Sequence, residues 1–348
     1  EEIVGTVNGG ADGEGTMQVR GVDGHSFTGI IGGSNDIGTL DIDNSATFAA
    51  AVSANTVTVA ASETAQFNAA LTAGNITLAD STAILKVIGN VTVAGNVTGG
   101  TINTTTAVAT FSGTIGSVGS KTAIDADFGT NFGGVVNATT ISVADGKTVD
   151  FDLSVTADTI TLGSSTSGSS VSFTGGTLKT VTGDLVSFNT NEKGTVISNG
   201  TADVVFAGNL GTAARSLLLL TATDDTTTNQ NVFVKGLTNA NGKDLNMKGN
   251  VEIGTNDAVL TGTTSDLLLS GTVAQTITAT AAGSVIKGAG NGQGIVKVSN
   301  AAGATLTISA GIPSKCCMKG RSVWPHILCP NLNSWLAFAS FSTAYSCV

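Results

Sequence analysis

Residues 48–59 read Phe-Ala-Ala-Ala-Val-Ser-Ala-Asn-Thr-Val-Thr-Val, and the same pattern returns 19 residues later, at 67–78, as Phe-Asn-Ala-Ala-Leu-Thr-Ala-Gly-Asn-Ile-Thr-Leu. Two further copies, at 132–143 and 151–162, are again 19 residues apart. Near the end of each copy, apolar residues alternate with Thr or Ser, which is the period of a β-strand and not of a helix. The pattern therefore predicts one strand-forming unit that repeats about every 20 residues.

Phenylalanines extend this spacing beyond the four copies. Most successive ones lie 15 to 22 residues apart, and the one longer interval, from Phe67 to Phe111, has Leu85 and Ile88 near the expected place. The series is Phe27, Phe48, Phe67, Phe111, Phe132, Phe151, Phe173, Phe188 and Phe206. A unit of about 20 residues cannot bury a core alone, so stacked units must share one. The sequence therefore predicts an all-β fold, a right-handed parallel β-helix (β-solenoid) with turns of about 20 residues and an interior phenylalanine ladder.

Composition divides the chain into three parts. All four Cys, all three Pro, both Trp and the only Tyr lie after residue 312, and every Asp and Glu lies before it. We expect an N-terminal cap over 1–26, a solenoid body over 27–312 that is regular to 211 and looser over 212–312, and a compositionally foreign tail over 313–348. Within the looser part, polar residues 221–230 predict an extended loop that projects from the solenoid.

The tail admits three interpretations. It is an adventitious or frame-shifted end, a small element that caps the last turn, or a membrane-proximal segment. The abrupt change in composition at residue 312 favours the first. Its apolar part, 334–348, is too short for a transmembrane helix, so we expect no transmembrane segment in this chain.

The charge balance restricts the partners. The formal net charge is −10, only 11% of the residues are charged, and Lys and Arg are not clustered. Nucleic acid is therefore excluded as a partner, because neutralising phosphates requires a basic patch. We expect the acidic surface to keep a long β-structure soluble.

Three pairs of aspartates stand at the spacing i, i+2: Asp41 with Asp43, Asp125 with Asp127, and Asp150 with Asp152. On a strand this spacing puts both carboxylates on one face, as glycosidases and polysaccharide lyases require. That face is solvent if the neighbouring apolar residues point inward, which favours an acidic outer stripe. We therefore assign no catalytic residue and expect a protein that is not an enzyme.

The sequence also predicts no metal-binding or cofactor-binding residues. His25 is predicted to be a turn residue, and Cys317, His326 and Cys329 form an incomplete set without the paired Cys-x2-Cys spacing of zinc sites. Asp41-Ile-Asp43-Asn44 offers oxygen ligands for Ca²⁺, but the glycine-rich nonapeptide array of calcium-binding β-helices is absent from the sequence. We expect no metal and no cofactor.

The motif Phe-x-Gly-x-Ile/Leu-Gly, at 27–32, 111–116 and 206–211, and the twelve-residue phrase stand on a background rich in Gly, Thr, Asn and Ala. Together they resemble the passenger region of rickettsial surface autotransporters, the outer-membrane protein A and B group. The resemblance covers 27–211 well and 212–312 loosely. The alternative is a similar bacterial surface-layer protein. The Cys-rich tail departs from the pattern of this family.

This resemblance implies an extracellular passenger at the bacterial cell surface, associated with the outer membrane. Such a protein forms a coat or filament by self-association and contributes to virulence as an adhesin that binds a host-cell surface receptor. The expected function is therefore structural and adhesive. The alternative is a β-helical carbohydrate-active enzyme of the polysaccharide lyase or hydrolase type.

Overall fold

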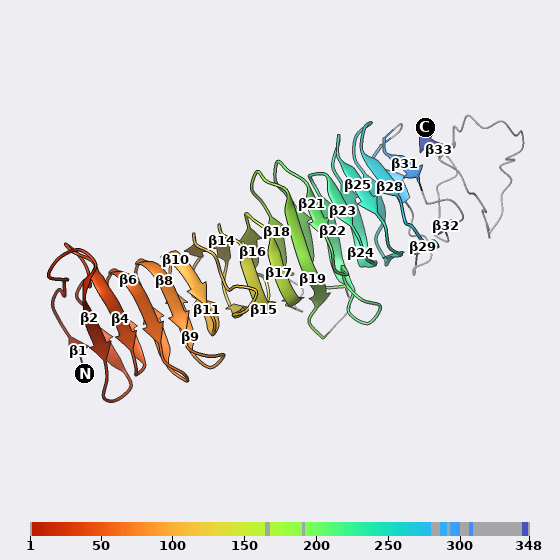
Figure 1. Ribbon diagram of the computed structural model, residues 1–348. Helices are drawn as coiled ribbons and strands as arrows, with labels where there is room; N and C mark the ends of the chain where they lie inside the picture. Colours follow the sequence, from red (N-terminus) through yellow and green to blue (C-terminus); the bar gives the residue numbers. More distant parts are fainter. Residues whose placement is uncertain are drawn as a thin grey trace, which may run out of the picture. The chain divides into compact units, whose positions relative to one another are not determined.

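The chain is an all-β solenoid. The computed structural model describes residues 2–163, 168–189, 192–279, 286–290, 293–299, 306–308 and 343–346. Parallel strands form about 12 turns of about 21 residues each, and the described residues contain no helix (Figure 1). The predicted parallel β-helix, with turns of about 20 residues, is confirmed.

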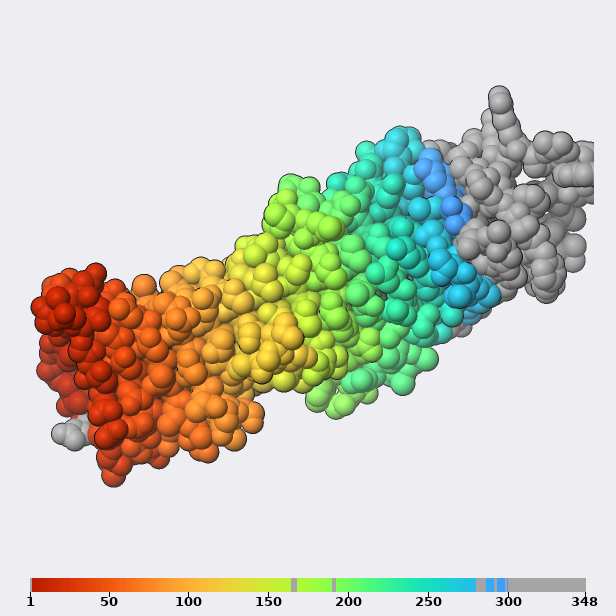
Figure 2. All heavy atoms as spheres, in the orientation of Figure 1, coloured from red at the N-terminus to blue at the C-terminus, as the bar shows by residue number. Residues whose placement is uncertain are grey.

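The chain divides into two compact units. Unit 1 comprises Glu1–Gly163 and Ser169–Ser172, and unit 2 comprises Ser164–Gly168 and Phe173–Val348. In Figure 2 the atoms of unit 2, from green to blue, lie in bands that follow the chain. This is the arrangement of a solenoid, in which each turn contacts only its neighbours.

The strands of unit 1 are β1 (Glu2–Ile3), β2 (Glu14–Val19), β3 (His25–Phe27), β4 (Ile37–Ile42), β5 (Ala46–Phe48), β6 (Val52–Val59), β7 (Thr64–Phe67), β8 (Leu71–Leu78), β9 (Ile84–Ile88), β10 (Thr92–Thr98), β11 (Thr101–Thr105), β12 (Ala109–Phe111), β13 (Thr122–Ala126), β14 (Thr130–Phe132), β15 (Val136–Val143), β16 (Thr148–Phe151) and β17 (Val155–Leu162). The odd-numbered strands β1 to β17 pair in order, all parallel. The even-numbered strands β2 to β16 do the same. Each turn therefore contributes one strand to each of two parallel sheets.

β18 (Ser170–Phe173) crosses the boundary between the units. The strands of unit 2 are β19 (Lys179–Ser187), β20 (Thr195–Ser198), β21 (Val204–Phe206), β22 (Leu217–Ala222), β23 (Thr226–Thr228), β24 (Val232–Asn239), β25 (Asp244–Met247), β26 (Val251–Ile253), β27 (Ala258–Leu260), β28 (Asp266–Leu269), β29 (Gln275–Ala279), β30 (Ile286–Gly288), β31 (Ile295–Val298), β32 (Leu306–Ile308) and β33 (Thr343–Ser346). One parallel sheet runs β19-β21-β23-β25-β28-β31. In the other, β20-β22-β24 leads to both β26 and β27, because the long β24 is followed by two short strands.

The strand period of two decides which side chains form the core. In β6, Val52, Val57 and Val59 are buried, whereas Ser53 and Thr58 between them face outward. The four phenylalanines that begin the repeated phrases, Phe48, Phe67, Phe132 and Phe151, are all at most 1% exposed. Buried residues of successive turns therefore pair in register and stack on one another. We call each such stack an interior column.

Two separate phenylalanine columns run through unit 1. Phe27, Phe48 and Phe67 stack with ring centroids 5.0 and 4.8 Å apart, and Phe67 then pairs with Val87. In the second column, Val52 pairs with Leu71, Leu71 with Val93, Val93 with Phe111, Phe111 with Phe132, and Phe132 with Phe151. The expected single ladder is therefore wrong, and the residue that follows Phe67 in register is Val87, not the expected Leu85 or Ile88.

The repeated phrase changes sheet between its second and third copies. The first two copies contribute β6 and β8 to the even-numbered sheet, and the last two contribute β15 and β17 to the odd-numbered sheet. Between them, Gly99 and Gly100 both adopt left-handed backbone conformations, with φ of +75° and +54°. A Cβ at Gly100 would lie 2.3 Å from the Cβ of Leu78, so this tight corner requires glycine.

The structure also bears on the expected boundaries. Residues 2–19 form β1 and β2, which pair in parallel with the following turn, so a cap formed by these residues is itself a solenoid turn. Parallel register continues past residue 211 through β28. The loop predicted over 221–230 is wrong, because β23 lies in the sheet with Thr226 and Thr228 buried. A three-residue strand flanked by Asp and Asn resembles a loop in sequence, and only pairing with β21 and β25 reveals it.

Most of the tail, 313–342 and 347–348, lies outside the described residues. Its remaining part forms β33, which pairs antiparallel with β31, with Ile295 opposite Ser346 and Val298 opposite Thr343. The interpretations of the tail stay predictions.

Asparagine side chains tie the corners of unit 2 together. The side-chain oxygen of Asn209 accepts the backbone N–H of Asn231 at 3.2 Å, Asn231 accepts that of Asn250 at 3.0 Å, and Asn250 accepts that of Thr276 at 2.8 Å. Corner backbone groups have no ladder partner of their own, so each asparagine satisfies a donor one turn away.

Candidate functional site

The most unusual position in the described chain is Lys179, at the start of β19. Its side chain is 0% exposed, whereas the preceding Leu178 is 62% exposed. Lys179 stands at the head of an interior column, in register with Val204, and Val204 with Thr226. A strand of unit 2 therefore places a lysine in the core and a leucine in solvent, the reverse of what hydrophobicity favours.

The Lys179 amine is held by backbone carbonyls. Its Nζ donates hydrogen bonds to the carbonyl oxygens of Gly175 at 3.1 Å and Thr177 at 3.0 Å. Both acceptors lie in the turn that leads into β19, which wraps around the end of the side chain. The turn therefore fixes where the amine points.

A buried carboxylate lies on the same side of unit 2. Asp224, in the corner between β22 and β23, is 1% exposed. Its Oδ1 accepts hydrogen bonds from Nζ of Lys243 at 2.7 Å and from the backbone N–H of Asp225 at 3.0 Å. Its buried Oδ2 has no hydrogen-bond partner among the described residues, which is costly for a buried carboxylate oxygen.

Gly200 locates both groups at one place. A Cβ built on Gly200 would lie 3.2 Å from Nζ of Lys179 and 3.5 Å from Oδ2 of Asp224. That Cβ would also lie 2.6 Å from the carbonyl oxygen of Gly175, so a larger residue does not fit beside the amine and the carboxylate. We call Lys179, Gly200, Asp224 and Lys243 the buried lysine–aspartate cluster.

More charges follow at the neighbouring corners. Hydrogen bonding to Asp224 raises the pKa of Lys243, with the charges of Asp225 and Asp203 acting in the same direction. Burial raises the pKa of Asp244, and the nearby carboxylates Asp266 and Asp225 raise it further. Lys297 forms an ion pair with Asp266. Lysines thus lie among the aspartates at the corners of successive turns in unit 2. Their positive charges reduce the repulsion among the carboxylates.

The core beside the cluster is also polar. Thr226 donates its hydroxyl to Oγ of Ser198 at 2.9 Å, and Nδ2 of Asn239 donates to the carbonyl oxygens of Lys243 and Asp266. Ser198, Thr226 and Asn239 are all at most 2% exposed. Sequence reasoning missed this site, because the alternation Leu178-Lys179-Thr180-Val181 does not reveal which face is buried.

The three predicted aspartate pairs lie in unit 1, on its outer surface. Asp41 accepts a hydrogen bond from Thr58 at 2.6 Å, and Asp43 forms an exposed ion pair with Arg20 at 2.7 Å. The neighbouring Leu40 and Ile42 are fully buried, as the outer-stripe interpretation requires. Both carboxylates therefore face outward at the end of β4.

The other two pairs contain carboxyls with raised pKa values. Burial raises the pKa of Asp125, and the charge of Asp127 raises it further, while Nδ2 of Asn103 lies 3.3 Å from an oxygen of each. Burial likewise raises the pKa of Asp150, with Ser172 opposing through a hydrogen bond and Asp152 adding to the rise. Asp125 lies on β13 and Asp150 on β16, so the pairs belong to different sheets.

His25 is not a turn residue, so that prediction is wrong. It begins β3, is 8% exposed, and its Nε2 lies 3.1 Å from the carbonyl oxygen of Arg20. No group of three or more His, Cys, Asp or Glu side chains in the described ranges is arranged to hold a metal ion. Cys317, His326 and Cys329 lie outside those ranges.

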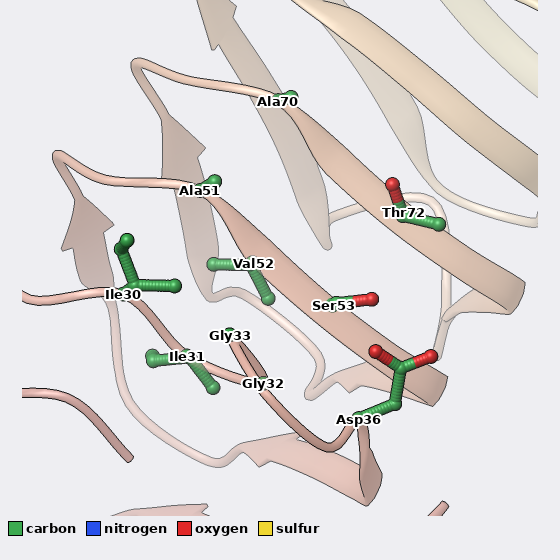
Figure 3. A pocket seen from close by; sticks show the side chains of 10 residues that line it. All are labelled: Ile30, Ile31, Gly32, Gly33, Asp36, Ala51, Val52, Ser53, Ala70 and Thr72. Atoms are coloured by element: carbon green, nitrogen blue, oxygen red, sulfur yellow. The ribbon is translucent and has the colours of Figure 1, made fainter. Parts of the chain in front are cut away.

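Unit 1 also has a shallow hollow of about 390 Å³ that crosses three turns. Figure 3 shows Ala51 and Ala70 at matching corners of successive turns, with Ile30 on the turn before them and Asp36 at the other end of the hollow. Ile30 is 44% exposed. Apart from Asp36, Ser53 and Thr72, the lining residues are glycine, alanine, valine or isoleucine.

Comparison with known proteins identified no relative of this chain. No protein-family model, curated protein or solved structure matches this chain. The resemblance to autotransporter passengers therefore stays a prediction. Among the described residues, no helix has both the length and the apolar character that a membrane span requires.

Proposed function

We propose that this chain is a structural and adhesive protein of the bacterial cell surface, an extracellular β-helical passenger or coat subunit associated with the outer membrane. It acts by binding, either to neighbouring copies of itself in a coat or filament, or to a receptor on a host cell.

One observation carries this proposal. The outward side chains of the odd-numbered strands in unit 1 form an unbroken row in register, and none of them is buried. The row consists of Thr47, Gln66, Lys86, Asn103, Asp125, Ser142 and Thr161. Parallel pairing spaces its members about 4.8 Å apart, so the solenoid presents a regular polar array.

Such an array suits a binding surface better than a catalytic one. Its members are polar and mixed in charge, and they repeat along the row instead of converging on one point. A target that itself repeats, such as a neighbouring subunit or a glycan-rich cell surface, can contact several turns at once, and many weak contacts then add through multivalency.

The test uses the folded full chain. Fluorescently labelled protein is incubated with cultured animal cells, and its association state is measured by sedimentation velocity over a range of concentrations. We expect saturable cell binding, self-association, or both, and we expect thermally unfolded chain to lose them. A full chain that stays monomeric and does not bind cells would overturn the proposal.

A matched pair of variants tests whether the row is the surface involved. Gln66→Ala, Lys86→Ala and Ser142→Ala together remove three members of the row. Thr58→Ala, Thr77→Ala and Thr98→Ala remove three outward residues in register on the even-numbered strands. We expect only the first set to weaken binding.

The raised pKa of Asp125 favours one alternative, a β-helical carbohydrate-active enzyme. A carboxyl with a raised pKa beside a second carboxyl, that of Asp127, resembles the acid and base of a glycosidase. Incubation with acidic and neutral polysaccharides, followed by an assay for newly formed sugar ends, tests it. Release of sugar that Asp125→Asn abolishes would establish the enzyme, and no release would remove it.

A further inference from the structure

The buried lysine–aspartate cluster contains an amine and a carboxylate that approach the same glycine. Nζ of Lys179 and Oδ2 of Asp224 lie 3.2 and 3.5 Å from the position that a Cβ on Gly200 would take, and both side chains are at least nine-tenths buried. Burying charged groups in one place is costly unless each of them is well paired. Yet Oδ2 of Asp224 lacks a hydrogen bond within the described part of the chain.

We propose that Lys179 and Asp224 are joined by an intramolecular isopeptide bond, formed by the folded chain itself. The bond is an amide between Nζ of Lys179 and Cγ of Asp224. It would link β19 to the corner between β22 and β23, which lie on different turns of unit 2. It does not depend on the proposed function.

The condensation balances without any added reagent. Nζ attacks Cγ, and the N–C bond forms as the bond from Cγ to Oδ2 breaks. The ammonium of Lys179 gives up two protons, Oδ2 accepts both, and it leaves as water. The product amide keeps Oδ1 as its carbonyl oxygen and one hydrogen on nitrogen.

The surrounding residues supply what this step requires. Burial in general favours the neutral amine, which is the nucleophilic form. The carbonyls of Gly175 and Thr177 orient Nζ. The ammonium of Lys243, 2.7 Å from Oδ1, stabilises the negative charge that develops on that oxygen during the attack. Oδ2, the oxygen without a hydrogen bond, is then the one that leaves.

In the ion pairs of the described part of unit 2, every lysine side chain is at least 28% exposed, so none of them meets these conditions. In the pair Lys235–Glu192, at 3.1 Å, the side chains are 28% and 33% exposed. Water keeps such amines protonated and solvates the carboxylate. The selectivity for Lys179 and Asp224 therefore comes from burial.

The mass of the full chain tests the proposal directly. Purified protein is denatured and its intact mass measured, since a covalent bond survives unfolding. We expect the mass to be lower than the sequence mass by one water molecule. After proteolysis, fragmentation should identify one branched peptide that contains both Lys179 and Asp224.

Variants supply the controls. Lys179→Met and Asp224→Ala should each restore the full sequence mass, apart from the substitution, whereas Lys235→Met should keep the deficit. Lys243→Met should slow bond formation in freshly made protein. Because the branched peptide is sought in the unmodified sequence, a variant that fails to fold does not affect the result.

Three outcomes would overturn the proposal. The first is an unmodified sequence mass for the full chain. The second is a deficit of one water without a branched peptide, which indicates dehydration of a single aspartate or asparagine segment. The third is a branched peptide that joins Lys179 to another carboxylate, such as Asp203.

Discussion

Phe67 and Phe111 occupy the same place in the sequence motif but lie in different interior columns of unit 1. Phe67 pairs with Val87, whereas Phe111 pairs with Val93, which is itself in register with Leu71. The interval of 44 positions from Phe67 to Phe111 is therefore not two plain turns. The phenylalanine of the motif lies in the odd-numbered sheet at Phe67, on β7, and in the even-numbered sheet at Phe111, on β12. Parallel pairing continues through both sheets of unit 1.

The first prediction tests the phenylalanine columns. Phe67 is 0% exposed and stacks on Phe48 at 4.8 Å. Phe67→Ala should lower the free energy of unfolding by about 3–5 kcal/mol, because neighbouring turns cannot collapse into the cavity. Denaturant unfolding of the full chain measures this.

Thr77→Lys is the control for that prediction, because Thr77 lies on β8, the next strand along the chain, and faces solvent. It should change the free energy of unfolding by about 0.5 kcal/mol or less. Equal effects of the two substitutions would contradict the inward and outward assignment.

The second prediction concerns the corner at which the motif changes sheet. A methyl group at Gly100 would lie 2.3 Å from Cβ of Leu78, and the backbone there has a φ of +54°. Gly100→Ala should therefore destabilise the chain by about 2–4 kcal/mol, from overpacking and left-handed strain together. Gly119→Ala is the matched control, since nothing lies within 4 Å of its Cβ position. A neutral Gly100→Ala would show that the corner can rearrange.

The third prediction concerns pH. Burial and Asp127 raise the pKa of Asp125 above its ordinary value of 3.8. The folded chain therefore binds this proton more tightly than the unfolded chain, so stability falls as pH rises from about 3.8 through the raised folded value. Asp125→Asn should stabilise the chain at pH 7 and lose this advantage at about pH 3. Unfolding curves at the two pH values measure it.

Asp80 gives the opposite sign. Hydrogen bonds from Thr82 lower its pKa below 3.8, so it contributes stability above that value and loses it as pH falls through the lowered folded value. Asp80→Asn should therefore destabilise the chain at pH 7 and have little effect at low pH. If both variants respond alike to pH, the assigned environments are wrong.

The fourth prediction concerns the asparagine corners of unit 2. Asn231 accepts the N–H of Asn250 at 3.0 Å through its side-chain oxygen. Asn231→Ala leaves that donor without its partner and should cost about 1 kcal/mol. Asn231→Asp keeps an acceptor oxygen and should cost less. Hydrogen exchange at the amide of Asn250 should quicken in the first variant only, and equal exchange in both would argue against the bond.

Much of the fold follows from local sequence. Val57-Thr58-Val59 and Ile76-Thr77-Leu78 alternate with the strand period, and in each the apolar residues are buried and the threonine faces outward. Recurrence about every 20 residues then requires stacked turns, because one such unit cannot bury its own core. The parallel solenoid, its turn length and the burial of the phenylalanines could all be predicted on these grounds.

The candidate site could not be predicted in the same way. Alternation states that Leu178 and Lys179 face opposite sides, but it does not state which side is the core. Pairing of Lys179 with Val204 on the next turn decides it. The position of Asp224 beside Gly200 likewise depends on corners that are distant in the sequence.

The sequence by itself therefore determined the repeating unit and the parity of each strand, because both arise from the backbone geometry of consecutive residues. Only the tertiary structure decided which column each residue joins and which charges enter the core. The reason is physical: a column is set by where corners and register shifts fall, such as the shift between Ala94 and Asn96, and these do not change the local alternation of the residues that follow. Phe132 and Phe48 accordingly share a sequence motif but lie in different sheets.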